Sequence, residues 1–293
     1  MKPSSFGYSR PESVAEAVAT LASIGPDGKV LAGGQSLLPL LNMRLAAPSY
    51  LVDINRLTEL AYISITDGHV AVGALARHCD VLGDRAAAAA QPLLSQALAL
   101  VAHPVIRNRG TTVGSVVHAD PAGEMTAVLA LLDGSVLLTS VAGQRCVRAG
   151  DFFLGVLESD IQPGELATEV RFPVLGKSAG CAFAEVSRRH GDYAICGVAA
   201  LAELGDDGGV RRARTAYLSV AGTPLVLDVT SALAGGQDGC AEAGRLAMDQ
   251  VRPVSDIHAT ASYRRHLAGV LTERACRDAL AHARERTSER RDH

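Results

Sequence analysis

The stretch Lys29-Val30-Leu31-Ala32-Gly33-Gly34-Gln35-Ser36-Leu37 decides the fold of this chain. It predicts a short apolar strand, a Gly-Gly turn and the first turn of a helix that continues through Leu38 and Leu41. Adjacent glycines accept positive φ angles and let backbone N–H groups approach a ligand without interference from a Cβ atom. Free amides at a helix start suit an anion such as a pyrophosphate. Taken alone, a Gly-Gly stretch of this kind is more often a tight strand-to-helix turn that binds nothing.

A second glycine-containing stretch, Arg107-Asn108-Arg109-Gly110-Thr111-Thr112-Val113-Gly114-Ser115, favours the binding interpretation. Two such loops can hold one long dinucleotide between them. The sequence contains no GxxxxGK[ST] motif and no GxGxxG fingerprint, which argues against a P-loop NTPase and against a Rossmann dinucleotide fold. It also contains no GxSxG nucleophile elbow and no HExxH zinc motif. We therefore expect two separate loops to form the site.

The composition is that of an ordinary globular protein. The chain has 293 residues, 48% of them hydrophobic and 20% charged, with a formal net charge of −3, which fits two domains or one large domain with an appendage. A nucleic-acid partner would favour a strongly basic chain with aromatic stacking platforms, but tryptophan is absent and aromatic residues make up only 4%. No apolar run approaches the roughly 18 residues of a membrane span.

The six cysteines are scattered and form no CxxC pair. This spacing argues against zinc ribbons and against iron–sulfur ligation within this chain, so we predict reduced thiols and no metal site. The first residues, Met1 to Phe6, lack the apolar region of a signal peptide, and we expect a cytoplasmic protein.

The pattern of apolar residues changes near residue 177, where Gly176-Lys177-Ser178-Ala179-Gly180 has the composition of a linker. Before it, the sequence predicts helices over 14–21, 93–101 and 128–132, a buried strand over 50–54, hairpins over 63–72 and 135–148, and a strand over 169–173. After it come three strand candidates, 182–187, 194–203 and 214–221, followed by helices over 239–248 and 262–286. Strands followed by helices predict an α+β domain with a three-stranded antiparallel sheet.

Four blocks of sequence occur in order and carry a family resemblance. They are Ala32–Leu37, Arg107–Ser115, His118-Ala119-Asp120-Pro121 and Arg188-Arg189-His190-Gly191-Asp192-Tyr193. Together they resemble the medium, FAD-binding subunit of the molybdenum hydroxylases, the xanthine dehydrogenase and carbon monoxide dehydrogenase family, over nearly the whole chain. The resemblance implies a two-lobed FAD-binding domain of the vanillyl-alcohol-oxidase type in residues 1–177. It also implies a small α+β domain of the carbon monoxide dehydrogenase flavoprotein type, with the three-stranded sheet, in residues 178–293.

The resemblance also implies a role and partners. A large partner subunit would carry molybdopterin, and a small one would carry two [2Fe-2S] clusters. This chain would hold FAD and pass electrons from the clusters to an external acceptor, in a dimer of heterotrimers with no nucleic acid and no membrane span. No residue of this chain is assigned a catalytic acid–base role, because the redox chemistry belongs to the cofactor.

The family pattern assigns cofactor-binding residues at matching positions. The pyrophosphate would be held by the two loops, and the cofactor set comprises Lys29, Val30, Leu31, Ala32, Gly33, Gly34, Gln35, Ser36, Leu37, Val101, Gly110, Thr111, Gly114, Ser115 and Val117. Asp120 and Glu124 would lie near the phosphates and ribose, Leu166 near the adenine or flavin, and Tyr193 against the isoalloxazine ring. The simpler interpretations are a helix-start carboxylate for Glu124, a core leucine for Leu166 and a packing aromatic for Tyr193.

One position departs from the family. The second loop usually carries Gly-Gly, and Val113 stands here at the first of the two glycines. A β-branched residue is poorly tolerated at positive φ. We expect this position to be extended, so that the valine is harmless.

Two other functions remain as alternatives. The chain could be an assembly subunit of the same complex with impaired flavin binding, of which Val113 would be the symptom. It could also be a free-standing flavin oxidase, although no acid–base constellation accompanies the glycine loops. The resemblance leaves open whether the complex oxidises carbon monoxide, an aldehyde, a purine or an N-heteroaromatic compound.

Overall fold

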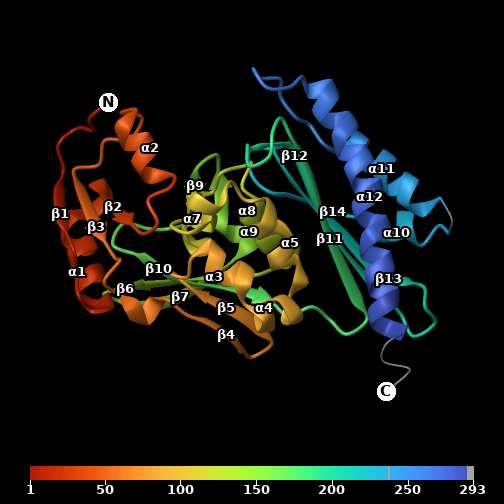
Figure 1. The fold of residues 1–293 in the computed structure, drawn as a ribbon, viewed down its shortest axis with the longest axis horizontal. Coiled ribbons are helices and arrows are strands. Elements are labelled where there is room, and N and C mark those ends of the chain that lie inside the picture. The colour runs from red at the N-terminus through yellow and green to blue at the C-terminus, as the bar shows by residue number, and fades with distance from the viewer. Residues whose placement is uncertain (237, 289–293) are drawn as a thin grey trace.

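The structure is a computed structural model that describes residues 1–236 and 238–288. Figure 1 shows three blocks side by side along the longest axis: a small N-terminal lobe, a central sheet with its helices, and a C-terminal sheet whose helices lie on the side away from the central block. Within the described residues, no helix combines the length and the apolar character needed to cross a bilayer.

The N-terminal lobe is a parallel three-stranded sheet in the order β1-β3-β2. Its elements are β1 (Gly7–Ser9), α1 (Val14–Ile24), the 3-10 turn Gly25–Asp27, β2 (Gly28–Leu31), α2 (Leu37–Asn42) and β3 (Tyr50–Asp53). The predicted first helix is confirmed, and its N-cap Ser13 accepts a hydrogen bond from the Glu16 amide at 3.2 Å. Because β2 and β3 are parallel, the loop after β2 and the residues after β3 lie at the same end of the sheet, where the strands finish.

The central sheet has the order β4-β5-β10-β6-β7, and its paired strands are antiparallel. Both predicted hairpins are present, and the first turns at Asp67 and Gly68, which both have positive φ as a two-residue hairpin requires. The strands are β4 (Ile63–Thr66), β5 (His69–Gly73), β6 (Ser135–Ser140), β7 (Gly143–Arg148) and β10 (Leu166–Pro173). The other elements are the 3-10 turn Thr58–Leu60, α3 (His78–Gly83), α4 (Arg85–Ala90), α5 (Pro92–Leu100), α6 (Pro104–Arg107), α7 (Thr112–His118), α8 (Glu124–Leu131), α9 (Ala149–Phe152), β8 (Phe153–Gly155) and β9 (Glu158–Ser159).

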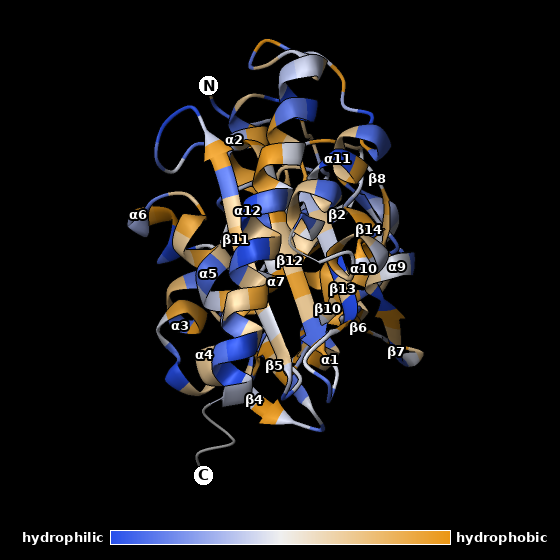
Figure 2. Ribbon diagram, turned by 90° about the vertical axis from the view of Figure 1, so that its right-hand side faces the viewer, coloured by the Kyte–Doolittle hydropathy of each residue, from blue (hydrophilic) through white to orange (hydrophobic). Residues whose placement is uncertain are grey.

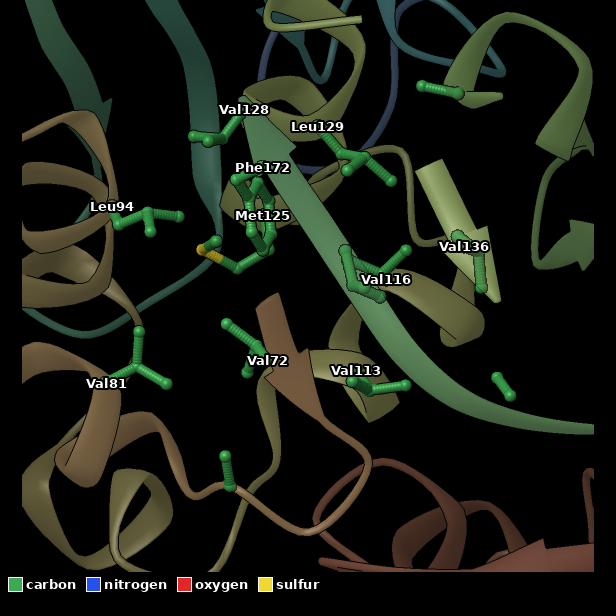
Figure 3. Packing of buried hydrophobic residues seen from close by; sticks show 14 of the residues in the cluster. Val72, Val81, Leu94, Val113, Val116, Met125, Val128, Leu129, Val136 and Phe172 are labelled. Atoms are coloured by element: carbon green, nitrogen blue, oxygen red, sulfur yellow. The ribbon is translucent and has the colours of Figure 1, made fainter. Parts of the chain in front are cut away.

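Helix α8 is the centre of the molecule. All eight of its residues are buried, so it lacks the polar face of a surface helix. It packs against α5 and α7 and against strands of the C-terminal sheet. Figure 3 shows Met125, Val128 and Leu129 of this helix among the core side chains, near Phe172 of β10. The same hydrophobic cluster includes residues of the C-terminal sheet, so this core continues from the first half of the chain into the second.

The C-terminal sheet is four-stranded, in the order β11-β12-β13-β14, and every pair is antiparallel. Its elements are β11 (Ala179–Ser187), β12 (Ala194–Leu204), β13 (Val210–Leu218), β14 (Leu225–Asp228), α10 (Thr230–Leu233), α11 (Gly239–Gln250) and α12 (Ala261–Ser288). The prediction of three strands is therefore wrong by one. Strand β14, Leu225-Val226-Leu227-Asp228, offers only three consecutive apolar residues, too short a run to be told from a loop by its sequence.

Helix α12 lies directly on this sheet. In Figure 2 it crosses in front of β11 and β12, with hydrophilic residues along the side that faces the viewer. Its small buried residues let the helix approach the strand closely: a Cβ atom on Gly180 would lie 2.2 Å from both the Ala279 carbonyl oxygen and the Ala283 amide nitrogen. Backbone atoms on a packed helix cannot move aside cheaply, so this position requires glycine.

We expect Gly180→Ala to lower the free energy of unfolding by about 2 kcal/mol or more, because the added methyl separates α12 from β11. Urea unfolding followed by circular dichroism measures this change. The matched control is Gly150→Ala, where a Cβ atom meets nothing within 4 Å. Equal stability of the two variants would contradict the packing account.

Candidate functional site

The first loop, residues 32–36 between β2 and α2, presents free backbone donors. Gly34 has φ +75°, a conformation that L side chains rarely adopt. Among the described residues, the amides from Gly33 to Leu37 donate no hydrogen bond to another protein group. All five residues are only half-buried. A run of free N–H groups in a turn of this kind forms a concave site with positive partial charge that suits an anion.

The two glycine loops meet at one backbone contact. A Cβ atom on Gly33 would lie 2.4 Å from the Arg109 carbonyl oxygen and 2.8 Å from the Gly110 Cα atom. The structure thus brings the two stretches together, as the sequence predicted. Glycine is required at position 33 because any side chain would push the loops apart.

The second loop leads into α7 and corrects our expectation for Val113. Thr111 is the N-cap of this helix, and its Oγ1 atom accepts the Gly114 amide at 3.1 Å. Val113 is the second residue of α7 and is therefore helical, not extended as predicted. Its side chain is 2% exposed and belongs to the core, where Figure 3 shows it beside Val116. A helical backbone with an inward side chain explains why valine is accepted.

Most amides of the second loop are already used within the protein. Those of Gly110, Thr112, Gly114 and Ser115 donate to Ile106 O, Ala76 O, Thr111 Oγ1 and Thr111 O. The first loop therefore supplies the larger share of free donors. The second loop forms the wall against which Gly33 rests.

His78 lies beneath the second loop and is 4% exposed. Its Nδ1 atom is 3.2 Å from Thr112 Oγ1, and its amide donates to the Gly110 carbonyl at 2.9 Å. Burial, and then the nearby Arg107 cation, lower the pKa of His78 to about 4. The imidazole is thus neutral near pH 7 and supports the loop through hydrogen bonding and packing.

Two carboxyl groups lie near each other where the two halves of the chain meet. Glu124, the first residue of α8, is 9% exposed, and burial together with the nearby Glu185 raises its pKa to about 8. Glu185 lies on β11, and burial raises its pKa to about 7. In the described part of the chain, Oε2 of Glu185 has no hydrogen-bond partner. At least one of these groups therefore carries a proton near neutral pH.

Tyr193 immediately precedes β12 and is 68% exposed. Partial desolvation of the phenol, with the nearby carboxylates of Asp120 and Glu124, raises its pKa. The preceding segment packs against His103, the N-cap of α6: the His103 and His190 rings meet edge-on, and a Cβ atom on Gly191, at φ +75°, would lie 2.6 Å from the His103 ring. An exposed aromatic ring on an anchored segment is suited to stacking on a ligand.

The other predicted residues have different surroundings. Asp120 is in the turn before α8, where its Oδ1 atom accepts the Ala122 amide at 2.8 Å. Lys29, Val30 and Leu31 belong to strand β2, which leads into the first loop. Val101 follows α5, Val117 lies in α7, and Leu166, at the start of β10, is 2% exposed within the core. The cofactor roles of these residues stay predictions.

Comparison with known proteins identifies the chain. Residues 4–175 match the family model of the FAD binding domain in molybdopterin dehydrogenase, and residues 181–279 match the CO dehydrogenase flavoprotein C-terminal domain. The chain belongs to the FAD-binding medium subunits of the molybdenum hydroxylases. Like its homologues, it is a subunit of an oxidoreductase.

Relatives in this medium-subunit family match the chain over nearly its whole length. The alpha subunit of the 6-hydroxypseudooxynicotine dehydrogenase complex of Paenarthrobacter nicotinovorans is 42% identical over 100% of both chains. The carbon monoxide dehydrogenase medium chain of Afipia carboxidovorans is 35% identical over 97% of this chain and 100% of its own. The structure of quinoline 2-oxidoreductase from Pseudomonas putida 86 superposes with a TM-score of 0.91 at 37% identity, covering 97% of this chain and 99% of the other.

Three residues of this medium subunit that surround the loops were not predicted from its sequence: Asn55, Arg77 and His78. Asn55 follows the buried strand β3, and a polar residue directly after a parallel strand is a usable signal for a site. Arg77 and His78 follow the apolar run Ala74–Ala76, and no sequence pattern there indicates a binding site. Their position against Arg109 and Gly110 is decided by the tertiary structure.

The buried carboxyl pair predicts a specific pH dependence. Glu124 has a pKa of about 8 in the folded chain against 4.5 as its ordinary value. Between these values the folded state holds a proton that the unfolded state has released, so stability falls as pH rises through this window. We expect Glu124→Gln to flatten the decline in free energy of unfolding between pH 5 and 8 by up to about 1 kcal/mol per pH unit.

Urea unfolding of the chain without added FAD at a series of pH values measures this effect. The exposed Glu59→Gln serves as the control and should retain the wild-type profile. If Glu124→Gln also retains it, the assignment of the proton to this pair is wrong.

Proposed function

We propose that this chain binds FAD across the two glycine loops and passes electrons through it to an external acceptor. The observation that carries the proposal is the contact of Gly33 with Arg109 and Gly110, which brings a row of free amides beside the second loop. A pyrophosphate is the part of FAD that such amides bind best. When bound, FAD supplies the capacity to accept and release one or two electrons.

The residues fit this cofactor. Gly33 and Gly34 provide a cradle that a Cβ atom would fill, and the amides from Gly33 to Leu37 are available as donors. Gly110 and Thr111, directly before α7, and Gly114 and Ser115, in its first turn, would border the same phosphates. We assign Lys29–Ala32, Val101 and Val117 to the surrounding wall of the site.

Further roles follow from position. Asp120 and Glu124 would receive hydrogen bonds from ribose or ribityl hydroxyls, and a protonated Glu124 could also donate one. Tyr193 would cover one face of the isoalloxazine ring and exclude water from it. Leu166 would pack near the adenine or flavin as part of the apolar lining.

We also propose the family's division of labour for the whole complex. A small partner would hold two [2Fe-2S] clusters and a large partner would hold molybdopterin and the substrate, in a cytoplasmic dimer of heterotrimers. We place the boundary between the two domains at residue 177 and assign the first to the vanillyl-alcohol-oxidase type. Relatives at 42% identity, named for 6-hydroxypseudooxynicotine and caffeine, favour an N-heteroaromatic substrate.

FAD titration of the purified full-length chain tests the cofactor assignment. We expect bound flavin with its visible absorbance band in the wild type, and a Kd raised about tenfold or more by Gly33→Ala, because the methyl would separate the loops. The control is Gly83→Ala, where the added Cβ meets nothing within 4 Å. A folded wild-type chain that takes up no FAD would instead support the assembly-subunit alternative.

Purification of the chain with its native partners tests the assignment to a complex. We expect a large chain and a small one with eight cluster cysteines, four for each of two clusters, to copurify with it. Substrate oxidation by the flavin-loaded chain alone would instead support the free-standing oxidase.

A further inference from the structure

A chain of side-chain hydrogen bonds joins the two glycine loops beneath their contact. The Asn55 Nδ2 atom donates to the Ala32 carbonyl of the first loop at 2.8 Å. The Arg77 guanidinium donates through Nη2 to Asn55 Oδ1 at 2.8 Å and through Nη1 to the Arg109 carbonyl of the second loop at 2.7 Å. One unbroken path thus runs from Ala32 to Arg109 through two side chains.

The path is fixed at its base. The second Asn55 Nδ2 hydrogen bond goes to Asp53 Oδ1 at 2.6 Å, and the Asn55 amide donates to the same oxygen at 2.9 Å. Tyr8 donates its hydroxyl to Asp53 Oδ2 at 2.6 Å. Burial alone would raise the pKa of Asp53, but the bonds from Tyr8 and Asn55 outweigh it and lower the pKa, so the carboxylate stays charged. Asn55 therefore has one orientation available to it.

The two bonded carbonyls matter because of peptide geometry. The C=O of one residue and the N–H of the next lie in one plane and point in opposite directions. When Asn55 holds the Ala32 oxygen, it directs the Gly33 N–H to the other side of the chain, which begins the row of free amides. When Arg77 holds the Arg109 oxygen, it fixes the surface on which Gly33 rests.

We propose that Asn55 and Arg77 are positioning residues that set the spacing and orientation of the two loops and thereby the affinity for FAD. This inference rests on the proposed FAD site. Both residues act through the loop backbone, and the role of Arg77 depends on its planar fork of donors as well as on its charge. A lysine has a single ammonium on a flexible stem and cannot hold Asn55 and Arg109 in the same fixed geometry.

The test is FAD binding by the full-length chain in four variants: Asn55→Ala, Arg77→Met, Arg77→Lys and the double variant Asn55→Ala/Arg77→Met. We expect each single variant, including Arg77→Lys, to raise the Kd for FAD about tenfold. Because both residues belong to one path, the double variant should bind little more weakly than either single variant, instead of showing the product of the two effects. Circular dichroism and thermal unfolding without FAD show which variants are folded.

The control is Arg56→Gln, which removes an exposed ion pair with Glu12 from the residue next to Asn55. It should bind FAD like the wild type. If Arg77→Met does not fold, two variants still carry the test: Arg77→Lys, which keeps the charge and most of the side-chain volume, and Asn55→Ala, which leaves the Arg77 bond to the second loop in place.

Three results overturn the inference. Wild-type affinity in folded Arg77→Lys means that the positive charge alone matters. Wild-type affinity in folded Asn55→Ala, or effects that multiply in the double variant, means that no shared path exists. Failure of the wild-type chain to bind FAD is a different result, because it removes the proposed function itself.

Discussion

The contact of the Gly33 backbone with the Arg109–Gly110 backbone is the constraint on which the site depends. The first loop leaves a parallel sheet in the N-terminal lobe, and the second precedes a helix that packs in the central lobe. Such loops approach this closely only where no Cβ atom stands between them. The resulting arrangement offers positive partial charge from peptide groups, which are already oriented and need no counter-ion.

The side chains around the loops act on the loop backbone. His78, beneath the second loop, is neutral near pH 7 because it is buried. Arg77 directs two of its donors to Asn55 and to the Arg109 carbonyl. In the proposed site, recognition of the FAD pyrophosphate would therefore rest on backbone geometry, which in turn rests on side chains that hold the loop carbonyls.

Helix α8 connects the site with the C-terminal half of the molecule. It is buried on every side, packs between the central lobe and the C-terminal sheet, and begins with Glu124, which lies near Glu185. The turn before it is tied to the C-terminal sheet, since the Ser219 amide donates to the Pro121 carbonyl at 2.8 Å. Because this interface is closely packed, a displacement of either half would also move the carboxyl pair and the segment that carries Tyr193.

The sequence by itself determined the elements with strong local patterns. The capped helix at Ser13, the hairpin at Asp67-Gly68, the glycine loops and the family were readable because turn chemistry and short motifs are local properties. Strand β14, the helical state of Val113 and the path through Asn55 and Arg77 were decided by the tertiary structure. Their physical cause is contact between residues far apart in the chain: β14 is held by pairing with β13, Val113 by the core, and Arg77 by a carbonyl that only folding brings within reach.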